Sequence, residues 1–277
     1  MPLILPCLAA LPIMLAVAAP AAEATTSVRV ASAYWATREG ISARVLSLIP
    51  ARPRAGVMLL PGGHGNINLS SQAQIGWGHD DFVIRTRAVY AQADFFTIVP
   101  DVAIDRKPPA DLGDYRRSPL QAHDLLAISG RLQRAVKKLF LVAYDRGATS
   151  ALNAVARGRT DSISGLVLIS PILEPAGSVL DDGAKLAFAK LPVLLISHAS
   201  DECSAGAASH LKEIAAAAAA QNFQAVSVTG GSDRYQLQDP LAYYQDSCNK
   251  KAPHAMAGLE GQVSNIVMQW LLKSGDL

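Results

Sequence analysis

Two aspartates and a histidine are the residues of this sequence whose types and order could do chemistry together. Asp145 follows an apolar run and lies in the pentapeptide AYDRG, residues 143–147, where small residues flank a nucleophile position at a tight turn. Asp201 follows a later apolar run, and His254 precedes the last helical segment. The order nucleophile, acid, base predicts that the three side chains form one catalytic site.

Each of these residues also has a simpler explanation. Asp145 could cap the helix that follows it, which aspartate does well. Asp201 could be a solvated loop carboxylate; we prefer it to Glu202 because it lies nearer the strand end and completes an H-x-x-D pattern. Of the six histidines, only His254 stands between the last predicted strand and the last predicted helix, and His64 is the second choice for the base.

A glycine-rich turn, PGGHG at residues 61–65, follows an earlier apolar run. Glycine allows the backbone to approach a substrate closely, and a turn at this point in the strand order can supply a backbone N–H to an oxyanion. The alternative is an ordinary tight turn. The residues predicted to bind the oxyanion or substrate are Gly62, Gly63, His64 and Arg146.

The cysteines support the same grouping. Cys203 lies two residues after Asp201, and Cys248 lies six before His254. A disulfide between them would tie the loop that carries Asp201 (the acid loop) to the loop that carries His254 (the base loop). It would close a loop of about 45 residues, and the lower chain entropy of the unfolded state predicts a stabilisation of roughly 4 kcal/mol. The alternative is two buried free thiols.

The elements that must position these residues alternate between strands and helices. Predicted strands cover residues 28–35, 41–49, 56–60, 95–99, 139–143, 165–169, 191–197 and 225–229. Predicted helices cover residues 80–93, 119–135, 148–157, 205–221 and 259–272. This pattern predicts one α/β domain, residues 25–277, with a mostly parallel eight-stranded sheet and helices on both faces.

The first 24 residues differ from the rest of the chain. They are apolar, contain no Lys or Arg, and end in the small-x-small pattern Ala22-Glu23-Ala24. Four prolines interrupt them, so a cleaved signal peptide is favoured over a membrane anchor, and Cys7 would be removed with it. We therefore expect a secreted or periplasmic protein without a stable membrane span.

Composition limits the partners. The 277 residues are 50% hydrophobic and carry a formal net charge of +2, which does not suggest a nucleic-acid partner. Neither a zinc-type ligand spacing nor a nucleotide-binding glycine motif occurs in the sequence, so we expect no metal and no cofactor. The expected partner is a small-molecule substrate.

With these motifs in place, the sequence resembles the small exported bacterial α/β-hydrolases. The similar stretches are residues 59–65, 82–87, 122–124, 146–151, 198–203 and 248–259. The resemblance implies an α/β-hydrolase fold whose elbow carries a nucleophilic serine, where this chain has Asp145.

An aspartate at the nucleophile position changes the expected chemistry. A carboxylate attacking an ester carbonyl forms an anhydride, which is unfavourable, whereas attack on a saturated carbon forms an alkyl ester that histidine and water can hydrolyse. Haloalkane dehalogenases and epoxide hydrolases of this fold work in that way. They also carry a cap domain, for which residues 171–190 are too short, and often a Trp where this chain has Arg146.

Two functions therefore remain open. The first is an exported hydrolase of a small ester-like or alkyl substrate that uses Asp145, Asp201 and His254. The alternative is a catalytically impaired homologue that acts as a periplasmic binding or scaffold protein. If the three side chains converge, two carboxylates flank one imidazole and raise the pKa of His254 above its usual value of about 6.5.

Overall fold

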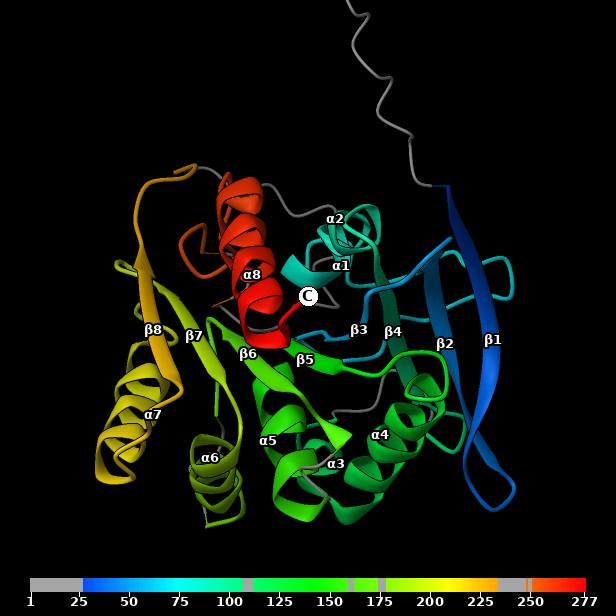
Figure 1. The fold of residues 1–277 in the computed structure, drawn as a ribbon, viewed down its shortest axis with the longest axis horizontal. Helices are drawn as coiled ribbons and strands as arrows, with labels where there is room; N and C mark the ends of the chain where they lie inside the picture. Colours follow the sequence, from blue (N-terminus) through cyan, green and yellow to red (C-terminus); the bar gives the residue numbers. More distant parts are fainter. Residues whose placement is uncertain (1–26, 107–111, 159–161, 174–177, 234–247, 249–250) are drawn as a thin grey trace, which may run out of the picture.

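The near-continuous apolar runs of the sequence form the central strands of one sheet in the computed structural model of this protein (Figure 1). The structure describes residues 27–106, 112–158, 162–173, 178–233, 248 and 251–277. The proposed signal peptide, residues 1–24, lies outside the described residues. In the part of the chain that is described, no helix is long and apolar enough to cross a membrane.

Eight strands make up the sheet, in the order β1-β2-β4-β3-β5-β6-β7-β8. They are Val28–Arg38 (β1), Ile41–Pro50 (β2), Ala55–Leu60 (β3), Phe95–Ala103 (β4), Leu139–Tyr144 (β5), Gly165–Ile169 (β6), Val193–His198 (β7) and Phe223–Val228 (β8). The pairings β1–β2 and β2–β4 are antiparallel, and the other five are parallel. The sheet is therefore mixed but mostly parallel, as predicted.

Helices cover both faces of the sheet (Figure 1). They are Phe82–Arg85 (α1), Arg87–Gln92 (α2), Gly113–Arg117 (α3), Pro119–Leu132 (α4), Gly147–Arg157 (α5), Ser178–Lys190 (α6), Ala205–Ala217 (α7) and Glu260–Gly275 (α8). Helices α4 to α7 contribute to the core on one face, and α1, α2 and α8 contribute to the core on the other.

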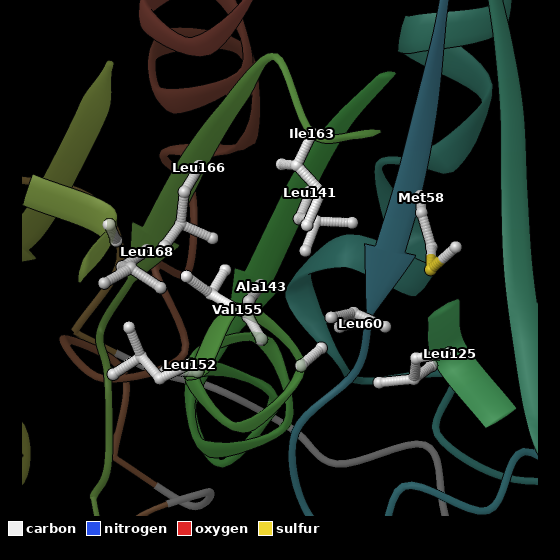
Figure 2. Close-up of a cluster of buried hydrophobic side chains, with 14 of the residues drawn as sticks. Met58, Leu60, Leu125, Leu141, Ala143, Leu152, Val155, Ile163, Leu166 and Leu168 are labelled. Atoms are coloured by element: carbon white, nitrogen blue, oxygen red, sulfur yellow. The ribbon is translucent and has the colours of Figure 1, made fainter. Parts of the chain in front are cut away.

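The two cores arise because strands buried on both faces need apolar side chains in both directions. In β5, Leu141 and Ala143 face the first core, whereas Phe140 and Val142 face the second. Figure 2 shows part of the first core, where side chains of β3, β5 and β6 lie together with side chains of α5, including Leu152. This packing fixes the carboxyl ends of β3, β5 and β7, from which the candidate site is built.

The helix predictions needed three corrections. The helix expected over residues 80–93 is two short helices, which meet at Thr86, where the hydroxyl donates a 2.7 Å hydrogen bond to the Phe82 carbonyl. Helix α3 was not predicted, because five residues are too few to show a helical period. Helix α6 was not predicted either; it packs against α5 and α7 in the helix layer.

Candidate active site

Asp145 occupies a strained turn between β5 and α5. Its φ is +53°, in the left-handed region that side chains other than glycine rarely adopt. Its backbone N–H donates to the Ile169 carbonyl at 3.0 Å, and its carbonyl accepts from the Ile172 N–H at 3.1 Å. The turn is crowded: a Cβ on Gly147 would lie 2.1 Å from the Leu60 carbonyl oxygen. These contacts explain the small-residue frame around position 145.

The glycine turn after β3 meets the Asp145 carboxylate. The Gly63 N–H donates to Asp145 Oδ2 at 2.7 Å. The neighbouring Gly62 N–H donates instead to Asp81 Oδ2 at 2.6 Å, so it does not point at Asp145. Gly62 contributes through its lack of a side chain, because a Cβ there would lie 2.4 Å from Asp145 Oδ2.

His254 joins the two aspartates, as the order of the sequence motifs predicted. Its Nδ1 lies 3.0 Å from Asp201 Oδ2, and its Nε2 lies 3.5 Å from Asp145 Oδ1. The first distance is that of a hydrogen bond, whereas the second is an ion-pair contact. Asp145 and His254 are fully buried, and Asp201 is 4% exposed.

Asp201 is held by the start of the loop that follows β7. Its carboxylate accepts hydrogen bonds from the Cys203 N–H at 3.0 Å and from the Ser204 hydroxyl at 2.6 Å. Cys203 forms the predicted disulfide with Cys248, with Cα atoms 5.9 Å apart. The acid loop and the chain segment before His254 are therefore covalently joined.

The backbone on both sides of the His254–Ala255 peptide is also held. The Tyr144 hydroxyl donates to the His254 carbonyl at 3.2 Å. Arg85 donates to the Ala255 carbonyl through Nη2 and to Glu260 Oε1 through Nε, the latter at 2.9 Å. Residues of β5, α1 and α8 thus fix the loop that carries the imidazole.

The charges of the site depend on one another. Burial disfavours the charged form of His254, but its contacts with Asp145 and Asp201 outweigh burial and raise its pKa to about 9. Burial would raise the pKa values of both aspartates. Contact with His254 instead lowers the pKa of Asp201 to about 2 and holds that of Asp145 below its usual value. At neutral pH an imidazolium therefore lies between two carboxylates, as the sequence predicted.

Asp81 is a further buried carboxylate beside the glycine turn. It caps α1 by accepting from the Val83 and Ile84 N–H groups at 3.0 and 3.3 Å. Burial raises its pKa to about 7, the nearby Asp145 charge adds to this rise, and the Gly62 N–H opposes it. Asp81 thus links the start of α1 to the turn that faces Asp145.

Two other predicted site residues lie at the same edge of the sheet. His64 lies in the glycine turn, but His254 is the histidine that contacts both carboxylates. Arg146 follows Asp145 and is the N-cap residue of α5, so it lies at the turn that carries Asp145. His198, from the H-x-x-D pattern, accepts from the Ser200 N–H at 3.0 Å and lies 3.0 Å from the Gly230 carbonyl.

Four residues that support the site were not predicted: Asp81, Arg85, Arg116 and Tyr144. Asp81 could have been found, because an Asp directly before a helical run signals an N-cap. Arg85 falls in one of the stretches that carry the family resemblance. Arg116 belongs to α3, which is too short to show a helical period in the sequence, so nothing indicated that its side chain turns inward.

A metal is poorly suited to this group of residues. Ligand atoms of Asp201, Cys203 and His254 lie within 4.8 Å of one another. However, the Cys203 sulfur is bonded to Cys248, and His254 Nδ1 faces the Asp201 carboxylate. Zinc and similar ions bind cysteine as a thiolate, and this cysteine is not available as one.

The arrangement suits attack by a carboxylate oxygen. Asp145 Oδ2 is held by the Gly63 N–H, the kind of donor that would bind a substrate oxyanion in a serine enzyme of this fold. Asp145 Oδ1 has no hydrogen-bond partner among the described residues and faces His254 Nε2. The carboxylate therefore has one oxygen held by a hydrogen bond and one oxygen without such a bond.

Comparison with solved structures identifies the fold. A dienelactone hydrolase from Anabaena variabilis is 17% identical, with a TM-score of 0.59 over 89% of this chain and 98% of that one. A bacterial brefeldin A esterase is 14% identical, with a TM-score of 0.61 over 95% and 81%. An esterase from Pyrococcus furiosus is 12% identical, with a TM-score of 0.60 over 89% and 93%.

These similarities show that the chain has the α/β-hydrolase fold. No protein-family model and no curated protein sequence matches it.

Proposed function

We propose that this protein is a hydrolase in which Asp145 attacks a saturated carbon of a small substrate and forms an alkyl ester. The observation that carries the proposal is the orientation of the carboxylate, with Oδ2 on the Gly63 N–H and Oδ1 facing His254. In a serine enzyme that N–H receives the oxygen of an ester substrate. Here the Asp145 carboxylate already accepts the hydrogen bond from that N–H, which favours alkyl substrates over acyl ones.

The first step leaves the acid–base pair ready for the second. Asp145 Oδ1 forms a bond to carbon, and the leaving group departs with the electron pair of its own bond. The new ester is neutral, so His254 loses one of the two carboxylate charges that raise its pKa. Its pKa falls, and His254 can release its proton and act as a base.

The second step regenerates the carboxylate. Neutral His254 takes a proton from water, and the hydroxide formed attacks the ester carbon, Cγ of Asp145. Negative charge develops on Oδ2, which the Gly63 N–H already contacts. The alcohol departs with the proton from His254, while Asp201 keeps the imidazole oriented through Nδ1. The carboxylic acid left at Asp145 then gives its proton to His254, which restores the carboxylate and the imidazolium.

A trapping experiment tests this proposal directly. In His254→Gln the base is missing, so the alkyl ester on Asp145 should accumulate when the variant is incubated with terminal haloalkanes or epoxides. Mass spectrometry of the peptide containing Asp145 should show the added alkyl group. Asp145→Asn combined with His254→Gln is the matched control and should show none. Failure of every alkyl substrate to label His254→Gln would contradict the proposal.

The variant Asp145→Ser tests the preference for alkyl over acyl substrates. The serine frees the Gly63 N–H for a substrate carbonyl oxygen and removes one anion from beside His254. We expect this variant to hydrolyse short aryl esters that the parent protein leaves intact. Release of the coloured phenol is the measurement, and Asp145→Ala is the control.

The complete burial of Asp145 and His254 favours a second candidate, a binding protein without turnover. In that case the charged triad stabilises the fold and does not react. Binding without turnover would leave His254→Gln unlabelled and Asp145→Ser inactive.

The compartment belongs to the same proposal. The Cys203–Cys248 bond supports an oxidising compartment. Residues 1–24, as a signal peptide, would direct the chain to such a compartment. A mature N-terminus at Thr25 in protein recovered from the periplasm would support export.

A further inference from the structure

The glycine turn, residues 61–65, is held by the buried guanidinium of Arg116. Arg116 Nη2 donates to the carbonyls of Pro61, Gly62 and Gly63 at 3.0, 2.9 and 3.1 Å. The Arg116 side chain comes from α3 and is 3% exposed. Three consecutive carbonyls of the turn therefore point at one cation.

The Gly62 carbonyl matters most, because it belongs to the same peptide group as the Gly63 N–H. In a trans peptide the C=O and N–H point in opposite directions. Holding the Gly62 oxygen on Arg116 therefore turns the Gly63 N–H toward Asp145 Oδ2, which it meets at 2.7 Å. A cation on the carbonyl also polarises the peptide and strengthens its N–H as a donor.

The same guanidinium reaches the other side of the site. Its Nη1 donates to the Ser150 hydroxyl at 2.9 Å and to the Arg146 carbonyl at 3.3 Å, both in the first turns of α5. Arg116 thus bridges the glycine turn and the start of the helix that follows Asp145. A lysine could not make these contacts, because one ammonium lacks the two separated donor arms of a guanidinium.

The fold makes room for this side chain. Gly65 has a φ of +73°, and a Cβ there would lie 2.4 Å from Arg116 Nη2. The helix itself is anchored because the neighbouring Tyr115 hydroxyl donates to Asp124, which pairs with Arg38 at 2.7 Å. Glycine at position 65 and the anchored helix both serve to admit the guanidinium.

We propose that Arg116 is a positioning residue that aims the Gly63 N–H at the Asp145 carboxylate. The role of Arg116 in orienting the Gly63 N–H does not require turnover, whereas its effect on catalysis rests on the proposed function. Arg116 does not touch the reacting atoms; it acts through the peptide group between Gly62 and Gly63.

The test reads the Gly63 amide by NMR in the ¹⁵N-labelled protein. In the parent, a hydrogen bond to a carboxylate shifts the Gly63 amide proton downfield. In Arg116→Lys and Arg116→Ala that proton should move upfield. Arg117→Met is the matched control, because Arg117 is the next residue of α3 and its guanidinium pairs with the exposed Asp114.

Added guanidinium ion distinguishes a loss of positioning from a loss of folding in Arg116→Ala. A cavity of about 30 Å³ adjoins Arg116 and is lined by Pro61, Gly65, Tyr115 and Ser150 among others, so the ion has space next to the truncated side chain. Millimolar guanidinium should return the Gly63 amide of Arg116→Ala toward its parent position and leave Arg116→Lys unchanged. In turnover, Arg116→Lys should lower kcat by about 100-fold with little change in KM.

An unchanged Gly63 amide in a folded Arg116→Lys or Arg116→Ala variant would overturn the inference. If Arg116→Ala does not fold, the Lys variant decides alone. If no alkyl substrate labels Asp145 in His254→Gln, the proposed function is refuted, whereas the amide shift would still decide the role of Arg116.

Discussion

The two sides of the His254 ring differ in how completely they are paired. On the Nδ1 side, Asp201 lies 3.0 Å away and is itself held by Cys203 and Ser204. On the Nε2 side, Asp145 Oδ1 lies 3.5 Å away, and neither atom has a hydrogen-bond partner among the described residues. One imidazole therefore faces a fully bonded carboxylate and a partly bonded one.

This difference separates a side that fixes the imidazole ring from a side that keeps unpaired polar atoms. Buried polar atoms without partners cost free energy, and such atoms are unusual in folded proteins. The Asp201 side has none of them and serves to fix the ring. The Asp145 side keeps two of them, Asp145 Oδ1 and His254 Nε2. The strained turn and the unpaired atoms of the site therefore lie on the Asp145 side.

The largest effect should come from removing the cation that both sides share. In His254→Leu, Asp145 and Asp201 stay buried without their positive partner, so the free energy of unfolding at pH 7 should fall by about 3–5 kcal/mol. Urea denaturation measures it. His210→Leu is the control, since its pairing with Asp181 is about one-third exposed and should contribute about 0–1 kcal/mol. Equal losses in the two variants would mean that burial does not strengthen the triad.

The next effect concerns the Nδ1 side alone. Replacing Cys203 and Cys248 with serine removes the link between the acid loop and the base loop. Loop-closure entropy for a separation of 45 residues predicts a loss of about 2–4 kcal/mol in unfolding free energy. Denaturation with and without reductant measures it, and the double variant should be insensitive to reductant. An unfolding free energy equal to that of the parent protein would show that the disulfide does not stabilise the Asp201 loop.

The smallest effect concerns the Nε2 side. Asp145→Asn keeps the size of the side chain and removes its charge, so the His254 pKa should fall from about 9 by about 1–3 units. An NMR titration of the His254 ring in both proteins measures this shift. An identical pKa would show that the Asp145 charge does not act on the imidazole.

The same change should alter how stability depends on pH. The His254 pKa is higher in the folded protein, about 9, than its usual value of 6.5, so its protonation stabilises the fold fully below about pH 6.5. That contribution is lost as pH rises through about 9. In Asp145→Asn the loss should occur at lower pH, as denaturation midpoints measured across the alkaline range would show.

Much of the fold could be predicted because the strand signals were strong. The apolar runs of β5, β6 and β7 predicted the centre of the sheet, and β1 and β2 were predicted to follow one another without a helix between them. Helices α3 and α6 were missed because one is short and the other gains its stability from packing on α5. Propensity alone does not report such contacts.

The candidate site was predictable where side chains follow strands in a known order. The convergence of Asp145, Asp201 and His254 followed from that order, and the disulfide followed from the positions of Cys203 and Cys248 beside Asp201 and His254. The direction of the Gly62 N–H toward Asp81 did not, because a peptide plane can rotate without any change in sequence pattern. The inward turn of Arg116 depends on a space at Gly65 that exists only in the folded chain.

The anchoring of the base loop has a consequence for protein engineering. Tyr144 and Arg85 hold the main-chain carbonyls of His254 and Ala255, and neither contact involves the imidazole ring. The position of the His254 main chain is therefore largely independent of the side chain at position 145. Position 145 is therefore a suitable place for a small library, in which serine, cysteine, aspartate and glutamate are compared above one unchanged acid–base pair.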